Sequence, residues 1–182
     1  MDVDRIEAST VIHRDPEAVY AFLIDFRKYA EHSKYLTDVA AYPIGENHRY
    51  ELEFSWWRLQ YTLHSEVTEA RPPTEIRWTV RRDIDALGGW DITPADGRER
   101  RSRAPAGSDQ SSLVRFWVEY DPASAGPETI DLPSFVPIEM IVDRAVELAR
   151  EEAERVVRSI VRELEGEDRQ IDLEITRVTD RG

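Results

Sequence analysis

"PIEMIVDRAVELAREEAERVVRSIVREL", residues 137–164, is the stretch on which the fold depends. Its apolar side chains recur every three or four residues, which is the spacing of a helix that buries one stripe. At ~1.5 Å per residue such a helix extends on the order of 40 Å and can cross a whole sheet. Gly166 follows closely and predicts the end of the helix. The predicted inward stripe comprises Ile138, Ile141, Val142, Ala145, Val146, Ala149, Ala153, Val156, Val157, Ile160, Val161 and Leu164.

Seven segments with strand periodicity precede this helix and would supply a sheet for it to cover. They comprise residues 4–13, 39–44, 50–54, 59–67, 76–80, 88–94 and 112–122. Short links join most of them, which predicts a mainly antiparallel sheet. After the first strand, Asp15 is placed as a helix N-cap and Pro16 as the first helical residue. A second short helical piece is expected at residues 33–36.

The segment YELEFSWWRLQYTL, residues 50–63, predicts a hairpin with large side chains on one face. We expect Tyr50 to pair with Leu63 and Phe54 with Leu59. This register leaves Trp56 and Trp57 at the connection, where two tryptophans predict a wider loop or a bulge. The tryptophans either fold back on the sheet or contact a partner, including a second copy of the chain.

Composition narrows the possible environments and partners. The formal net charge is −13, and only two of the 24 basic residues are lysines. Such an acidic chain is repelled by nucleic acid and by anionic membranes, so we expect neither as a partner. Scarce lysine with abundant carboxylates is typical of proteins from a high-salt cytoplasm. With no cysteine, no leader pattern and no membrane-length apolar run, the sequence predicts a cytoplasmic protein without stable membrane insertion.

The sequence contains no recognisable catalytic or cofactor motif, so we expect no cofactor and assign no catalytic residue. The four histidines lack ligand spacing, and we expect no metal site. Asp83 and Asp85 are candidates for a general base. Alternatively, they are ion-paired residues of a loop. The pair Gly88–Gly89 is interpreted as a turn or bulge beside Trp90.

The order of elements and two motifs resemble the START-like superfamily (helix-grip, SRPBCC), which includes polyketide cyclases, lipid-transfer domains and coenzyme Q-binding proteins. The motifs are "VIHRDPEAVYAFLIDFRKYAEHSKYLTDV" and "PPTEIRW…GGWDITP". The resemblance implies an α+β fold: a curved seven-stranded antiparallel sheet wrapped around the long C-terminal helix, with two short helices after strand 1. The resemblance spans residues 4–165, and we expect a START-like ligand-binding domain at 1–166. Residues 167–182 are a C-terminal tail that departs from the family and either adds an edge strand within the chain or pairs with a second copy. An arginine-rich segment, 98–111, departs from the family pattern and is expected to be a solvated hairpin extension.

The resemblance also implies an elongated cavity between the sheet and the final helix. We expect binding or transport of a hydrophobic small molecule such as a quinone, isoprenoid or lipid. A cyclase or dehydratase using the same cavity stays open as an alternative, as does an interaction module whose cavity is filled. The expected ligand-binding residues are the large inward side chains and two helix residues: Tyr50, Phe54, Tyr61, Trp78, Trp90, Phe116, Tyr120, Ile141 and Arg144.

Overall fold

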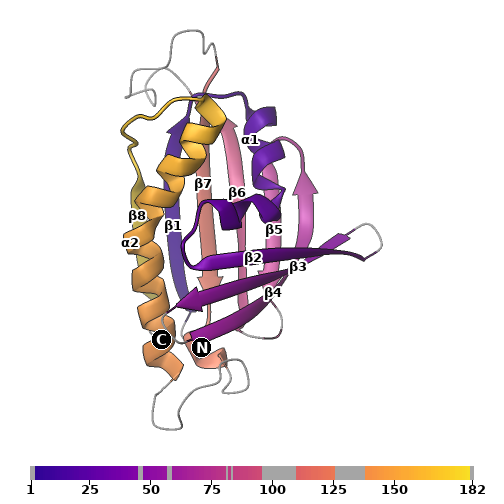
Figure 1. The fold of residues 1–182 in the computed structure, drawn as a ribbon, viewed down its shortest axis with the longest axis vertical. Helices are drawn as coiled ribbons and strands as arrows, with labels where there is room; N and C mark the ends of the chain where they lie inside the picture. The colour runs from indigo at the N-terminus through magenta and orange to yellow at the C-terminus, as the bar shows by residue number, and fades with distance from the viewer. Residues whose placement is uncertain are drawn as a thin grey trace.

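A computed structural model describes residues 3–44, 47–56, 59–80, 82, 84–95, 110–125 and 138–180. Within them, one antiparallel sheet has the strand order β2-β3-β4-β5-β6-β7-β1-β8. Figure 1 shows that β2, β3 and β4, at one edge of the sheet, run at a steep angle to the other strands. The expected α+β helix-grip fold is confirmed. The strands are β1 (Val3–Ile12), β2 (Leu36–Ile44), β3 (Asn47–Trp56), β4 (Leu59–Arg71), β5 (Glu75–Val80), β6 (Ala86–Pro94), β7 (Ser112–Tyr120) and β8 (Glu174–Asp180).

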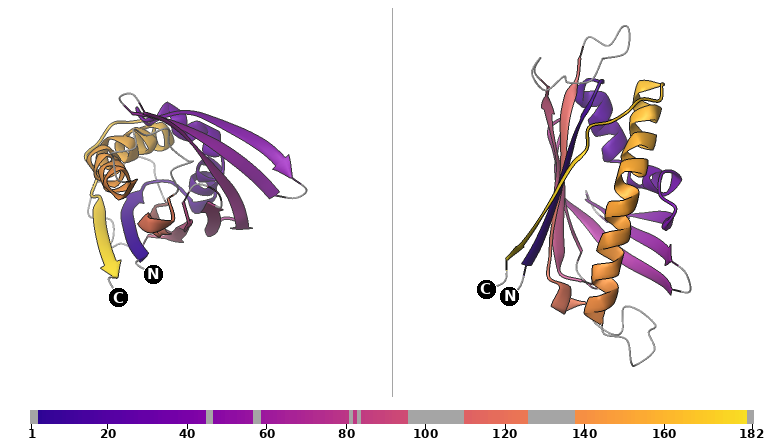
Figure 2. Two further views of the ribbon diagram at one scale, coloured as in Figure 1. Left: turned by 90° about the horizontal axis from the view of Figure 1, so that it is seen from below. Right: turned by 90° about the vertical axis from the view of Figure 1, so that its left-hand side faces the viewer.

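All the longer helical elements lie on one side of the strands. They are α1 (Pro16–Leu23), the 3₁₀ helix η1 (Phe26–Glu31) and α2 (Ile138–Glu165); a short η2 (Pro122–Ser124) follows β7. Figure 2 shows α2 as a second layer beside the sheet. We call the sheet face toward α2 the inner face and the opposite one the outer face. No helix in the described ranges is both long and apolar enough to span a membrane.

The second short helix lies at Phe26–Glu31, so its expected position at residues 33–36 is wrong. Ser33 explains the difference. Its hydroxyl accepts the backbone N–H of Tyr35 at 3.2 Å and of Leu36 at 3.1 Å. This local turn competes with helix formation and delivers the chain directly into β2.

The start of α1 agrees with its sequence signals. Pro16 is the first helical residue, and Asp15 accepts the backbone N–H of Ala18 at 2.8 Å. We expect Asp15→Ala to lower the free energy of unfolding by about 1 kcal/mol, because that N–H loses its acceptor. Urea denaturation measures the change. Asp15→Asn keeps an acceptor and serves as the control; an equal loss in both variants would contradict the capping role.

The β3–β4 hairpin is longer than expected. Phe54 pairs with Tyr61 and Trp56 with Leu59, so the predicted register is wrong by two residues. A shift of two keeps every side chain on its predicted face, since strand side chains alternate. Pairing continues through Trp56, and the link is therefore only two residues long rather than a wide loop. Residues 57–58, including Trp57, lie outside the described residues.

The interpretation of Gly88–Gly89 as a turn or bulge is also wrong. Both glycines lie inside β6, where Gly88 pairs with Trp78 and Gly89 with Arg77. A Cβ atom on Gly88 would lie 2.4 Å from Cζ2 of Trp78, and one on Gly89 would lie 2.6 Å from the Arg77 guanidinium. The glycines therefore admit two large side chains of β5, one on each face of the sheet.

The chain leaves α2 at Gly166 and then forms a further strand, β8. Gly166 follows α2 with φ = +80°, and its N–H donates to the Arg162 carbonyl at 2.9 Å. β8 then pairs antiparallel with β1, placing Arg5 opposite Val178. The sheet consequently has eight strands, with β8 as one edge.

Candidate functional site

The inner face is tightly packed at one end. Ile76 and Ile92 are fully buried, and Val114 is 4% exposed. Val19 of α1 and Val161 of α2 are among the residues of the same core. The C-terminal half of α2 and α1 therefore close this end of the sheet with ordinary core packing.

Three large aromatic side chains beside this core are only half-buried. Trp78, Trp90 and Phe116 lie on the inner face of three neighbouring strands, β5, β6 and β7. The Trp78 and Phe116 rings are stacked with centroids 6.3 Å apart, and those of Trp90 and Phe116 are 4.8 Å apart. We call these three residues the aromatic row. They present apolar ring surface that the protein itself leaves partly uncovered.

The β3–β4 hairpin adds a second aromatic pair. Phe54 and Tyr61 are half-buried, with ring centroids 5.9 Å apart. Tyr50 is different, because it is 6% exposed and its ring lies 4.6 Å from that of Phe26. The packing of η1 thus places Tyr50 within the core, apart from the half-buried group.

The N-terminal half of α2 covers the inner face incompletely. Ile141 is half-buried, whereas Ala145 and Ala149 are exposed, so the predicted stripe is wrong at these two alanines. Leu148 is buried instead. Arg144 is exposed and pairs within the helix, at 2.8 Å from Glu147. The half-buried Ile141 and the aromatic row are therefore available surfaces, while the Arg144 guanidinium is engaged with a carboxylate.

Tyr120 belongs to a polar cluster near the end of the inner face. Its hydroxyl donates to Asp4 Oδ2 at 3.2 Å, and Arg177 of β8 donates to the same oxygen. Asp4 is 3% exposed. Burial raises the pKa of Tyr120 to about 12, so the hydroxyl stays protonated as a donor. The sequence offered one signal for this cluster: Asp4 occupies an inner position in phase with Ile6.

The remaining candidates are Asp83, Asp85, Trp56 and the arginine-rich segment. Asp85 is exposed and its carbonyl accepts from the N–H of Asp121 at 2.9 Å, while Asp83 is outside the described residues. Trp56 is half-buried at the end of β3, and the described part of 98–111 does not include its arginines. Within the described residues, no group of three potential ligands is arranged to hold a metal ion.

Two of the four histidines, His13 and His32, are buried. His13 Nδ1 lies 2.8 Å from Ser111 Oγ, and His32 Nδ1 lies 2.8 Å from Ser159 Oγ on α2. Glu163 Oε2 lies 2.9 Å from His32 Nε2, but the two atoms form no hydrogen bond. Each histidine is hydrogen-bonded to a segment far away in the sequence. Local sequence spacing therefore could not predict that they are buried.

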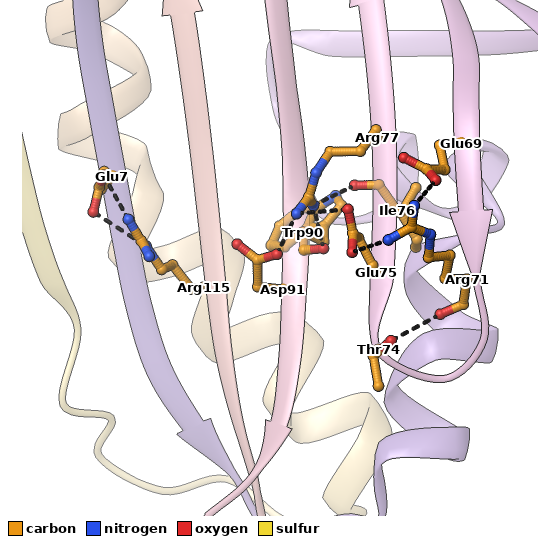
Figure 3. Close-up of polar contacts among 10 residues, drawn as sticks. All are labelled: Glu7, Glu69, Arg71, Thr74, Glu75, Ile76, Arg77, Trp90, Asp91 and Arg115. Carbon is orange, nitrogen blue, oxygen red and sulfur yellow. Dashed lines mark hydrogen bonds and ion pairs between the residues drawn. The ribbon is translucent and has the colours of Figure 1, made fainter.

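Several ion pairs lie on the outer face. Figure 3 shows Arg77 beside Asp91 at 2.6 Å and Arg115 beside Glu7 at 2.7 Å, with α2 behind the strands. Trp117 lies on this face, with the guanidinium carbons of Arg5 and Arg77 4.9 and 5.3 Å from its ring centroid. Trp117 therefore serves as an internal reference for the tryptophans on the inner face.

Comparison with solved structures places this architecture in a known class. The Zhui aromatase/cyclase from Streptomyces sp. R1128 is similar with a TM-score of 0.67 and 14% identity, over 90% of this chain and 94% of that one. A START superfamily protein from Mycobacterium smegmatis is similar with a TM-score of 0.58 and 16% identity, over 88% and 99% of the two chains. The protein therefore has the START-like, helix-grip fold of these structures, as the sequence indicated.

The family follows from the sequence match. Residues 4–165 match the model of the polyketide cyclase/dehydrase and lipid transport family, and the chain belongs to that family. It is a family of proteins that act on or carry hydrophobic molecules. No curated protein sequence matches the chain. The matched region ends before β8, so this strand lies outside the family pattern.

Proposed function

We propose that the protein binds a hydrophobic small molecule between the inner face of its sheet and the N-terminal half of α2. One observation supports this most strongly: Trp78, Trp90 and Phe116 remain half-buried in the middle of a sheet face that a long helix spans. Neighbouring Ile76 and Ile92 on the same face are fully buried. This difference in exposure separates the packed end of the core from an apolar surface that no other part of the described protein fully covers.

The proposed ligand is one that completes this cover. Removing apolar surface from water is worth roughly 25 cal/mol per Å², so a guest on the aromatic row gains affinity from every ring face that it shields. Flat rings and isoprenoid chains both match such faces, which supports a quinone, an isoprenoid or a lipid as the ligand class. Membership of a family that handles polyketides and lipids supports the same class.

A neutral dye tests this function without interference from the acidic surface. The dye is neutral because the net charge of −13 would repel an anionic dye. We expect delipidated protein to bind N-phenyl-1-naphthylamine with an increase in dye fluorescence. Trp78→Leu and Phe116→Leu should each weaken binding about 5- to 10-fold through lost ring contact.

Trp117→Leu is the matched control, since it removes a tryptophan from the outer face of β7, the strand that carries Phe116 on its inner face. Its dissociation constant for the dye should equal that of the parent protein. Equal weakening in all three variants, or no dye binding at all, would contradict the proposed site.

A further inference from the structure

The C-terminal half of α2 is fixed by polar contacts with distant segments. Buried Glu152 accepts the backbone N–H of Lys34 at 2.7 Å. Ser159 is hydrogen-bonded to His32, and the carbonyl of Leu164 accepts from Arg14 at 2.8 Å. Together with the buried apolar residues Ile160 and Val161, these contacts hold the helix from about residue 152 onward against the rest of the fold.

The N-terminal half of α2 is held differently. Among the polar contacts of the described residues, one joins residues 138–150 to the sheet: Arg177 donates to Asp143 Oδ1 at 3.3 Å. Arg144 pairs with Glu147 and Glu151 inside the helix and adds no such tie. Leu148 is buried here and Ile141 and Val146 are half-buried, whereas Ala145 and Ala149 are exposed.

Arg177 connects this half-helix to a buried carboxylate. The same guanidinium nitrogen donates to Oδ2 of Asp4, which also accepts the Tyr120 hydroxyl. Arg177 therefore lies between two negative groups, Asp4 on the sheet and Asp143 on the helix. Without it, these carboxylates would face each other with no positive charge between them.

We propose that β8 is a clasp, with Arg177 as its positioning residue, that holds the N-terminal half of α2 against the sheet and thereby slows ligand exchange. The part of this proposal that concerns ligand exchange rests on the proposed binding function. β8 lies outside residues 4–165, the region that matches the family.

Hydrogen exchange followed by mass spectrometry tests the clasp without any ligand. In Arg177→Met, amides of residues 140–150 should exchange at least fivefold faster than in the parent protein, while those of 155–164 stay unchanged. Asp143→Ala removes the acceptor of the same contact at an exposed side chain and should give the same selective increase. Arg115→Met is the control, because it removes an arginine that pairs with Glu7 on the outer face and contacts no helix residue in the described structure.

Stopped-flow dissociation of N-phenyl-1-naphthylamine supplies the second readout, with an expected increase of at least threefold in both variants. Unchanged exchange at 140–150 in Asp143→Ala overturns the clasp, even if Arg177→Met unfolds more widely. Selective exchange with unchanged dye dissociation overturns its role in ligand access. Selective exchange in a protein that binds no dye supports the clasp and contradicts the proposed binding function, so the two failures are distinguishable.

Discussion

Glu165→Gln is expected to lower the free energy of unfolding by about 3 kcal/mol, which is typical of a broken buried ion pair. The Glu165 side chain is fully buried, and both of its oxygens accept from Arg169 at 2.7 and 2.8 Å. Oε1 also accepts the backbone N–H of His13 at 2.8 Å. This carboxylate joins the end of α2 to the loop after β1. Its negative charge therefore stabilises the contact between these two segments at the packed end of the core. Urea denaturation measures the loss.

Asp168→Asn is the matched control, since Arg158 and Asp168 form an ion pair near the same end of α2 but are half exposed. Its loss should be much smaller, because solvent screens exposed pairs. Comparable losses in the two variants would contradict the importance of the buried pair.

At acidic pH, the difference in the free energy of unfolding between the parent protein and Glu165→Gln should disappear. Burial alone would raise the pKa of Glu165, but hydrogen bonds from Arg169 and from the His13 N–H outweigh it and leave the pKa below its usual value. A lowered folded-state pKa gives stability that is fully present above the unfolded value of about 4.3 and is lost as the pH falls further. The two urea midpoints should therefore converge below about pH 4.

Gly88→Ala is expected to cost about 1–3 kcal/mol of stability and to disturb the proposed binding surface. The new Cβ would lie 2.4 Å from Cζ2 of Trp78 and 2.6 Å from the Trp117 carbonyl oxygen. The indole is one side chain and has room to turn, but the carbonyl belongs to the adjacent strand. Relief therefore displaces both the ring and the β6–β7 ladder. Thermal unfolding and dye affinity measure the two consequences.

A double-mutant cycle separates the two clashes. In a Trp78→Leu background, Gly88→Ala should cost less stability than in the parent protein, because one of its two obstacles is gone. An equal cost in both backgrounds would mean that the indole does not lie over Gly88.

Much of the fold was predictable because its periodic segments are long. The stripe of residues 137–164 and the alternation in seven strands determined the order of the elements, and Asp15 with Pro16 marked the start of α1. The hairpin register was not predictable, since pairing Phe54 with Leu59 or with Tyr61 puts the same side chains on the same face. The helix predicted at 33–36 failed because the Ser33 hydroxyl captures two backbone N–H groups there.

The candidate site was less predictable than the fold. Alternation places Tyr50 and Trp78 on the inner face alike, yet only the packing of Phe26 against Tyr50 makes one a core residue and leaves the other half-buried. The polar contacts of Arg177 depend on β8 pairing with β1, which brings together residues at opposite ends of the chain. No local spacing carries that information.

The most direct test of the central claim follows the five tryptophan indoles during ligand addition. In ¹H–¹⁵N spectra assigned by single substitutions, titration with N-phenyl-1-naphthylamine should shift the indole signals of Trp78 and Trp90. The signal of Trp117, on the outer face, should stay in place. Unmoved Trp78 and Trp90 signals at saturating dye, or a shift confined to Trp117, would contradict a hydrophobic binding surface beneath α2.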